Sequence, residues 1–134
     1  MLKPLAPPDA IEWAASIYAP FALTWEAAKP LQKGVRVIGR APEDAAVVDI
    51  SLSTRRSVKA ISLVCPISTD YVLLLNHTLA LIHPRATIAD ADHWLAQRLM
   101  LLKQRPRVLA TWGAWTIDLR VTEGLMAILM KPRY

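Results

Sequence analysis

The chain has 134 residues, of which 54% are apolar and 20% charged. This composition excludes a disordered chain, and the length predicts a single domain over residues 1–134. Its four glycines and one cysteine exclude a collagen-like chain, a disulfide scaffold and a cysteine-rich zinc module. The net charge of +5 favours partners that carry negative charge.

The first 30 residues are predicted to form two helices. Apolar residues fall on one helical face over residues 9–19, and Pro20 ends that helix. Because proline fits the first position of a helix, Pro20 also favours a second short helix, which carries Phe21 and Trp25 and ends near Pro30.

The next segment alternates apolar and polar residues with a period of two, which predicts strands. Residues 35–38 form a short first strand. Residues 46–53 and 58–65 then form a hairpin, and its turn carries Arg55 and Arg56.

Residues 69–83 fit two different structures. Their leucine content favours a helix by intrinsic propensity. Two apolar runs on either side of Asn76 and His77 also match a pair of buried strands around a two-residue turn. We interpret this segment as the hairpin.

One long helix is predicted over residues 88–104. Thr87 and Asp90 have the spacing of a capping box at its start, and Pro106 ends it. Apolar residues within it recur at helical spacing, which indicates an amphipathic helix packed on a sheet.

Three strands follow, at residues 107–112, 114–121 and 125–131, and the middle one alternates strictly between apolar and polar residues. The sum is an α+β domain, in which two N-terminal helices accompany a mostly antiparallel sheet and the long helix precedes a C-terminal three-stranded meander. The last strand is apolar on both faces, so we expect both faces to be buried, by the rest of the chain or by another chain.

The positive charge gathers at the C-terminal end. Residues 98–134 hold seven Lys or Arg residues and two acidic residues, which accounts for the whole net charge. Phosphates or carboxylates are the groups that such a surface attracts. The candidate binding residues are Arg55, Arg56, Lys103, Arg105, Arg107, Trp112 and Trp115. A solvated basic surface without a partner is the alternative.

Trp112 and Trp115 are candidates because aromatic rings stack on nucleic-acid bases. In one continuous strand, residues three positions apart face opposite sides, so one of the two rings would leave the core. A bulge at Gly113 would place both on one face instead.

No phosphate-binding loop, dinucleotide fingerprint, nucleophile elbow or metalloprotease motif is present in the sequence. Asp90, His93 and Gln97 share a helical face but make no complete ligand set, so we predict no metal and no cofactor. Cys65 lies in an apolar run, which indicates a buried thiol rather than a nucleophile.

We expect a small non-enzymatic binding or assembly protein that acts through protein–protein contacts, as a homo-oligomer or with a different chain. Its basic C-terminal surface would face an acidic or nucleic-acid-bearing partner. The alternative is a metal-independent ribonuclease of toxin type that uses His77, His83 and Arg85. One histidine would remove the 2′-hydroxyl proton of RNA, the other would protonate the leaving group, and Arg85 would stabilise the phosphorane. Prolines interrupt the N-terminal residues, and the best apolar run is too short for a membrane span, so we expect a cytoplasmic protein with no membrane partner.

Overall fold

The computed structural model describes residues 7–53 and 57–133. Within these ranges the chain forms three α-helices and eight strands, and the strand pairs of known register are antiparallel. The predicted α+β class is therefore confirmed. The chain divides into two compact units, one up to Leu63 and one from Val64, and each is described by itself.

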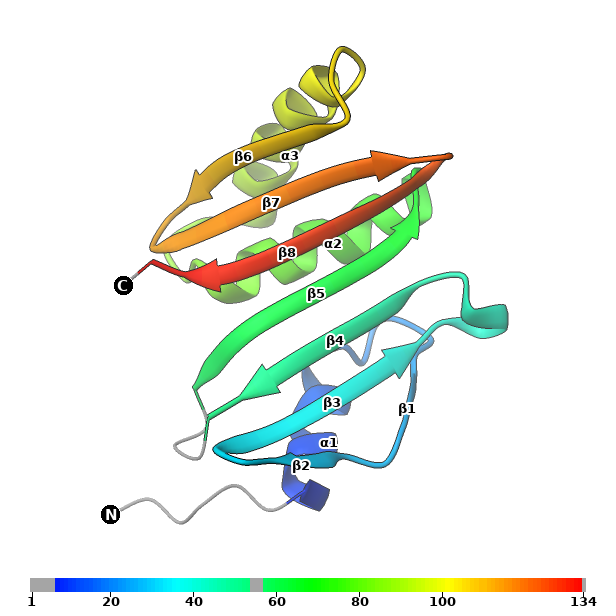
Figure 1. Ribbon diagram of the computed structural model, residues 1–134, viewed down its shortest axis with the longest axis vertical. Coiled ribbons are helices and arrows are strands. Elements are labelled where there is room, and N and C mark those ends of the chain that lie inside the picture. The colour runs from blue at the N-terminus through cyan, green and yellow to red at the C-terminus, as the bar shows by residue number, and fades with distance from the viewer. Residues whose placement is uncertain (1–6, 54–56, 134) are drawn as a thin grey trace. The chain divides into compact units, whose positions relative to one another are not determined.

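The first unit contains one helix and five strands (Figure 1). Strand β3 pairs antiparallel with β1, β2 and β4, and β5 is the hydrogen-bonded neighbour of β4. The elements are α1 (Pro7–Ile17), β1 (Thr24–Trp25), β2 (Lys29–Leu31), β3 (Gly34–Arg40), a 3-10 turn (Pro42–Asp44), β4 (Val47–Leu52) and β5 (Val58–Pro66), whose last residues belong to the second unit.

The predicted second helix over residues 20–30 is wrong, because β1 and β2 occupy this segment. Trp25 lies directly opposite Gly39 in the β1–β3 pair, where the missing side chain leaves room for the indole ring. The same ring packs against Tyr18 with 5.8 Å between centroids. These tertiary contacts outweigh the local preference for a helix that begins at Pro20.

The strands predicted at residues 46–53 and 58–65 are present as β4 and β5. Next to their connection, the backbone N–H of Ser53 donates to the carbonyl oxygen of Ser57 over 2.8 Å. Arg55 and Arg56, which the sequence places in this turn, lie outside the described residues.

The second unit contains two helices and three further strands. Strands β6, β7 and β8 pair antiparallel in chain order, and both helices lie on one side of them (Figure 1). The elements are α2 (Thr69–Ile82), α3 (Ile88–Leu102), β6 (Arg107–Trp112), β7 (Trp115–Thr122) and β8 (Leu125–Pro132).

The predicted hairpin over residues 69–83 is wrong, because α2 spans this segment. Two polar side chains of this segment, Thr78 and Asn76, donate hydrogen bonds within the helical packing. Thr78 donates its hydroxyl hydrogen to the carbonyl oxygen of Leu74, one helical turn earlier. The Asn76 amide donates to a carboxylate oxygen of Asp92 on α3 over 2.9 Å. The helix that the leucine content favours therefore forms, and its packing against α3 accommodates Asn76.

Helix α3 begins as the sequence predicts. The Asp90 backbone N–H donates to the Thr87 hydroxyl over 3.1 Å, and the Asp90 carboxylate accepts from the Thr87 backbone N–H over 2.9 Å. This reciprocal pair is the capping box. The helix ends at Leu102, two residues before the predicted end at residue 104.

Two-residue turns join the three C-terminal strands. Gly113 has a φ of 57° between the paired residues Trp112 and Trp115, and Glu123 and Gly124 have φ of 52° and 81° in the second turn. Positive φ at these positions matches the twist of an antiparallel hairpin. Each turn fixes the register of its two strands, because the two residues that flank it pair with each other and thereby set every pair further along the strands.

The turn at Gly113 also decides where the two tryptophans lie. Trp112 and Trp115 are directly opposite each other across the hairpin, so they share one face of the sheet. They therefore do not face opposite sides, as residues three positions apart in one continuous strand would.

Candidate contact face on the C-terminal sheet

The sheet of β6, β7 and β8 has two different faces. One face is buried and holds the alternating apolar residues Val108, Trp112, Ile117, Leu119, Met126, Ile128 and Met130. The opposite side chains, which we call the open face, are Arg107, Leu109, Thr111, Thr116, Asp118, Arg120, Thr122, Leu125, Ala127, Leu129 and Lys131. Two of its leucines, Leu109 and Leu125, are 68% and 48% exposed.

Among the described residues, the chain itself buries only one face of the last strand, and burial of the other face by another chain stays a prediction. Met126, Ile128 and Met130 are at most 2% exposed, whereas Leu129 on the other face is 37% exposed. Within the described residues, β8 therefore packs on one face only.

An ion-pair cluster occupies the centre of the open face. The Arg107 guanidinium donates two hydrogen bonds to the Asp118 carboxylate, Nε to Oδ1 over 3.1 Å and Nη2 to Oδ2 over 3.0 Å. The Arg120 Nη2 donates to the same Oδ2 over 3.2 Å. Hydrogen bonds from Arg107, followed by those from Arg120, hold the pKa of Asp118 below its usual value. Asp118 therefore stays ionised at neutral pH and keeps both guanidinium groups in place.

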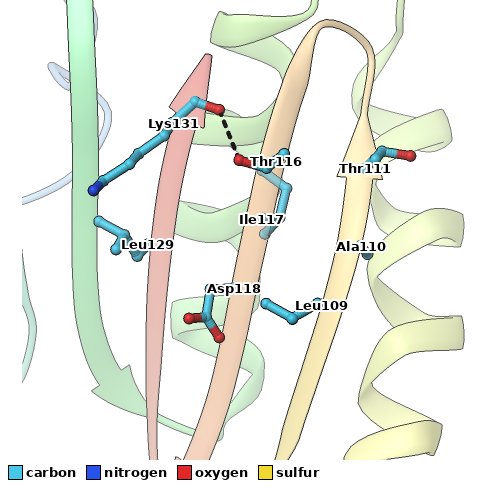
Figure 2. Close-up of a pocket in the computed structure, with 8 residues that line it drawn as sticks. All are labelled: Leu109, Ala110, Thr111, Thr116, Ile117, Asp118, Leu129 and Lys131. Carbon is cyan, nitrogen blue, oxygen red and sulfur yellow. Dashed lines mark hydrogen bonds between the residues drawn. The ribbon is translucent and has the colours of Figure 1, made fainter. Parts of the chain in front are cut away.

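Apolar side chains flank this cluster because of the strand register. Leu109 on β6 and Leu129 on β8 both lie directly opposite Asp118 on β7. They line a hollow of about 420 Å³ on the sheet (Figure 2). Its remaining lining residues are Ala110, Thr111, Thr116, Ile117, Asp118 and Lys131. The hollow therefore combines an apolar surface with hydroxyl groups, a carboxylate and an amine.

The charge of the open face is positive. It carries Arg107, Arg120 and Lys131 against the single carboxylate of Asp118. Across the described part of the chain, Lys131 makes no ion pair with a carboxylate. Its exposed ammonium group is thus available to an external anion.

Of the predicted basic residues that the structure describes, Lys103, Arg105 and Arg107, only Arg107 lies on this face. Lys103 and Arg105 are exposed in the connection between α3 and β6. Lys103 borders a second hollow of about 530 Å³, whose other lining residues are the apolar Ile67, Ala96, Leu99, Met100, Leu102 and Val121.

Both predicted tryptophans belong to the face opposite the open one. The Trp112 indole N–H donates to the carbonyl oxygen of Leu79 over 2.8 Å. Its ring lies 5.3 Å from the Trp94 ring and 4.9 Å from the His83 ring, between centroids. Trp112 thereby joins β6 to both helices, while Trp115 is half-buried.

The three residues of the ribonuclease hypothesis occupy different local settings. His77 lies within α2 and is half-buried, His83 follows the last residue of α2, and Arg85 is exposed in the next turn. The His83 ring packs edge-on against Trp112. This contact gives His83 a packing role.

Cys65 is fully buried, and desolvation raises the pKa of its thiol to about 11. A thiol in this state is a poor nucleophile at neutral pH. Across residues 7–53 and 57–133, no three His, Cys, Asp or Glu side chains come together as metal ligands would. Asp90 serves the helix cap, and the His93 and Gln97 side chains contact each other over 3.3 Å.

No protein-family model, no curated protein and no solved structure matches this chain. Among the described residues, no helix has the length and apolar character needed to cross a membrane.

The sequence did not single out Leu109, Asp118, Arg120 or Lys131 as candidate site residues, although all four lie on the open face. A signal for them was present in the alternation of β7, which puts Asp118 and Arg120 on its polar side. Counting outward from the two-residue turn at Gly113 then places Leu109 opposite Asp118 and Arg107 opposite Arg120.

Proposed function

We propose that this protein is a non-enzymatic binding module, and that the open face of β6–β8 contacts an acidic protein surface with an apolar centre. The observation that carries the proposal is the combination of exposed leucines and an ordered cationic cluster on one sheet face. Exposed apolar side chains gathered on one side of a sheet are typical of a contact surface.

The two kinds of side chain have different roles in this proposal. Leu125 and Leu129 supply apolar area that a partner removes from water, at roughly 25 cal/mol for each Å² buried. The guanidinium groups of Arg107 and Arg120 are already oriented by Asp118, so binding immobilises fewer rotatable bonds. Their outward N–H groups and the Lys131 ammonium favour carboxylates on the partner.

An acidic protein fits this face better than a nucleic acid does. Both guanidinium groups share one carboxylate, which reduces the charge that they offer to phosphates. The exposed side chains between them are aliphatic, whereas single-stranded nucleic acids bind aromatic platforms on which their bases stack. Trp112, which the sequence suggested as a stacking platform for bases, is buried.

The test compares the proteins that two matched double variants capture from the native host. Leu125→Ser with Leu129→Ser removes apolar side chains from the open face, and Leu73→Ser with Met100→Ser removes even more exposed apolar side chains from α2 and α3. We expect a partner that the wild type and the helix variant capture and that the open-face variant loses. Its affinity, remeasured with purified partner, should fall at least tenfold in the open-face variant, which corresponds to about 1.4 kcal/mol.

Charge and nucleic acid are tested in parallel. Lys131→Glu should slow association with the purified partner. The control variant Lys103→Glu should change the association rate less. Equal loss of partner in both double variants would contradict the proposed surface.

RNA cleavage in EDTA that His77→Ala or His83→Ala abolishes would favour the ribonuclease instead. Binding of random oligonucleotides that persists at about 0.15 M salt would favour a nucleic-acid partner.

A further inference from the structure

Strand β6 forms an edge of the C-terminal sheet. Its neighbour on one side is β7, and no other strand within the described ranges pairs with its second side (Figure 1). A free edge presents a row of unpaired backbone N–H and C=O groups, which is a template for another strand.

The register identifies which backbone groups of β6 point outward. Trp112 and Trp115 flank a two-residue turn, so they form a hydrogen-bonded pair, and hydrogen-bonded pairs recur at every second residue along β6. The bond from the Val121 N–H to the Pro106 carbonyl oxygen, over 2.9 Å, continues the same series. The N–H and C=O groups of Arg107, Leu109 and Thr111 therefore face away from β7.

This edge lacks the features that usually prevent pairing. Natural edges are often protected by a charged side chain or a proline at the centre of the strand. The centre of β6 is instead Leu109, and the only charged side chain is Arg107 at its first position. The Arg107 guanidinium is directed to Asp118 on β7, inside its own sheet.

We propose that β6 pairs antiparallel with β6 of a second copy of this chain, with Leu109 opposite Leu109 of that copy. In this register Arg107 lies opposite Thr111 of the other copy, so no two like charges meet. The outward backbone groups of Arg107, Leu109 and Thr111 then meet their equivalents as hydrogen-bonded pairs. The interface is self-complementary, as a two-fold dimer requires.

The exposure of Leu109 supports a second copy as the partner of this edge. Leu109 has the most exposed leucine side chain in the described structure, at 68%. In the proposed dimer each Leu109 packs against its equivalent on the open face, so both side chains leave water. The dimer also joins the two open faces into one continuous surface. This inference does not depend on the proposed function, because it concerns the strand edge.

The test uses charge at position 109 and measures mass by sedimentation equilibrium. The wild type should be a dimer, whereas Leu109→Lys should be a monomer, because two ammonium groups would face each other in the paired strands. The control Leu129→Lys carries the same charge on the same face, away from the edge, and should remain a dimer.

A mixture of two variants tests the register. Leu109→Lys and Leu109→Asp should each be monomeric, and an equimolar mixture should restore the dimer through opposite charges at the two-fold axis. Circular dichroism of each variant should match the wild type. A monomeric wild type at about 100 µM, where a dimer with a micromolar dissociation constant is nearly complete, would overturn the proposal. A dimeric Leu109→Lys, or a mixture that stays monomeric, would overturn it as well.

Discussion

Replacing Ile128 by Asp should unfold the second unit. Ile128 is 2% exposed on the buried face of β8 and lies opposite Leu119, which is fully buried. An unpaired carboxylate at this position costs several kcal/mol, and domains of this size are stable by only about 5–15 kcal/mol. Urea denaturation followed by circular dichroism measures the loss.

The matched control for this substitution is Leu125→Asp, which introduces the same carboxylate on the same strand. Leu125 is 48% exposed on the open face, and its directly opposite residue is the uncharged Thr122. We expect this variant to lose less than about 1 kcal/mol, as exposed substitutions usually do. Equal loss of stability in the two variants would mean that both faces of β8 are buried.

Replacing Trp112 by Ala should lower the free energy of unfolding by about 3–5 kcal/mol, the usual cost of truncating a buried tryptophan. The ring packs against Trp94 and His83, and its N–H donates to the carbonyl oxygen of Leu79. The variant therefore loses the contacts that join β6 to α2 and α3.

Trp115→Ala is the control, since the half-buried Trp115 lies opposite Trp112 in the same hairpin. Trp115→Ala should lower the free energy of unfolding clearly less than Trp112→Ala does. In the described structure, no hydrogen bond or ring contact to either helix involves Trp115. A larger loss for Trp115→Ala than for Trp112→Ala would contradict the assignment of Trp112 as the packing centre.

The parts of the fold that follow from local pattern could be predicted from the sequence. Alternation with a period of two identified β7, and the Thr87–Asp90 spacing identified the start of α3. Both signals depend on residues that are close in the chain, so no tertiary contact is needed to read them.

The failures occurred where tertiary contacts decide. Trp25 lies in a strand because Gly39 of β3 leaves space for its ring. Residues 69–82 form a helix although Asn76 suggested a turn, and the Asp92 carboxylate on α3 accepts a hydrogen bond from the buried Asn76 side chain. Neither Gly39 nor Asp92 could be assigned as a partner before the fold was known.

The candidate site was missed for a different reason. The sequence analysis chose residues by type and took the basic and aromatic ones, whereas the open face depends on register. Asp118 is notable only once Arg107 and Arg120 are known to converge on it. That convergence follows from the two-residue turn at Gly113, which pairs Arg107 with Arg120 and Leu109 with Asp118.

The sheet of β6–β8 has one buried face, and we propose that a partner contacts the open face on its other side. Single cysteines placed at positions 125 to 130 test it by their reaction with a soluble thiol reagent. The native Cys65 is the unreactive standard, because burial raises its pKa to about 11. We expect positions 125 and 129 to react quickly and positions 126, 128 and 130 to react slowly. The captured partner should slow the reaction at positions 125 and 129. Uniformly slow reaction along the strand, or no protection by the partner, would contradict the account.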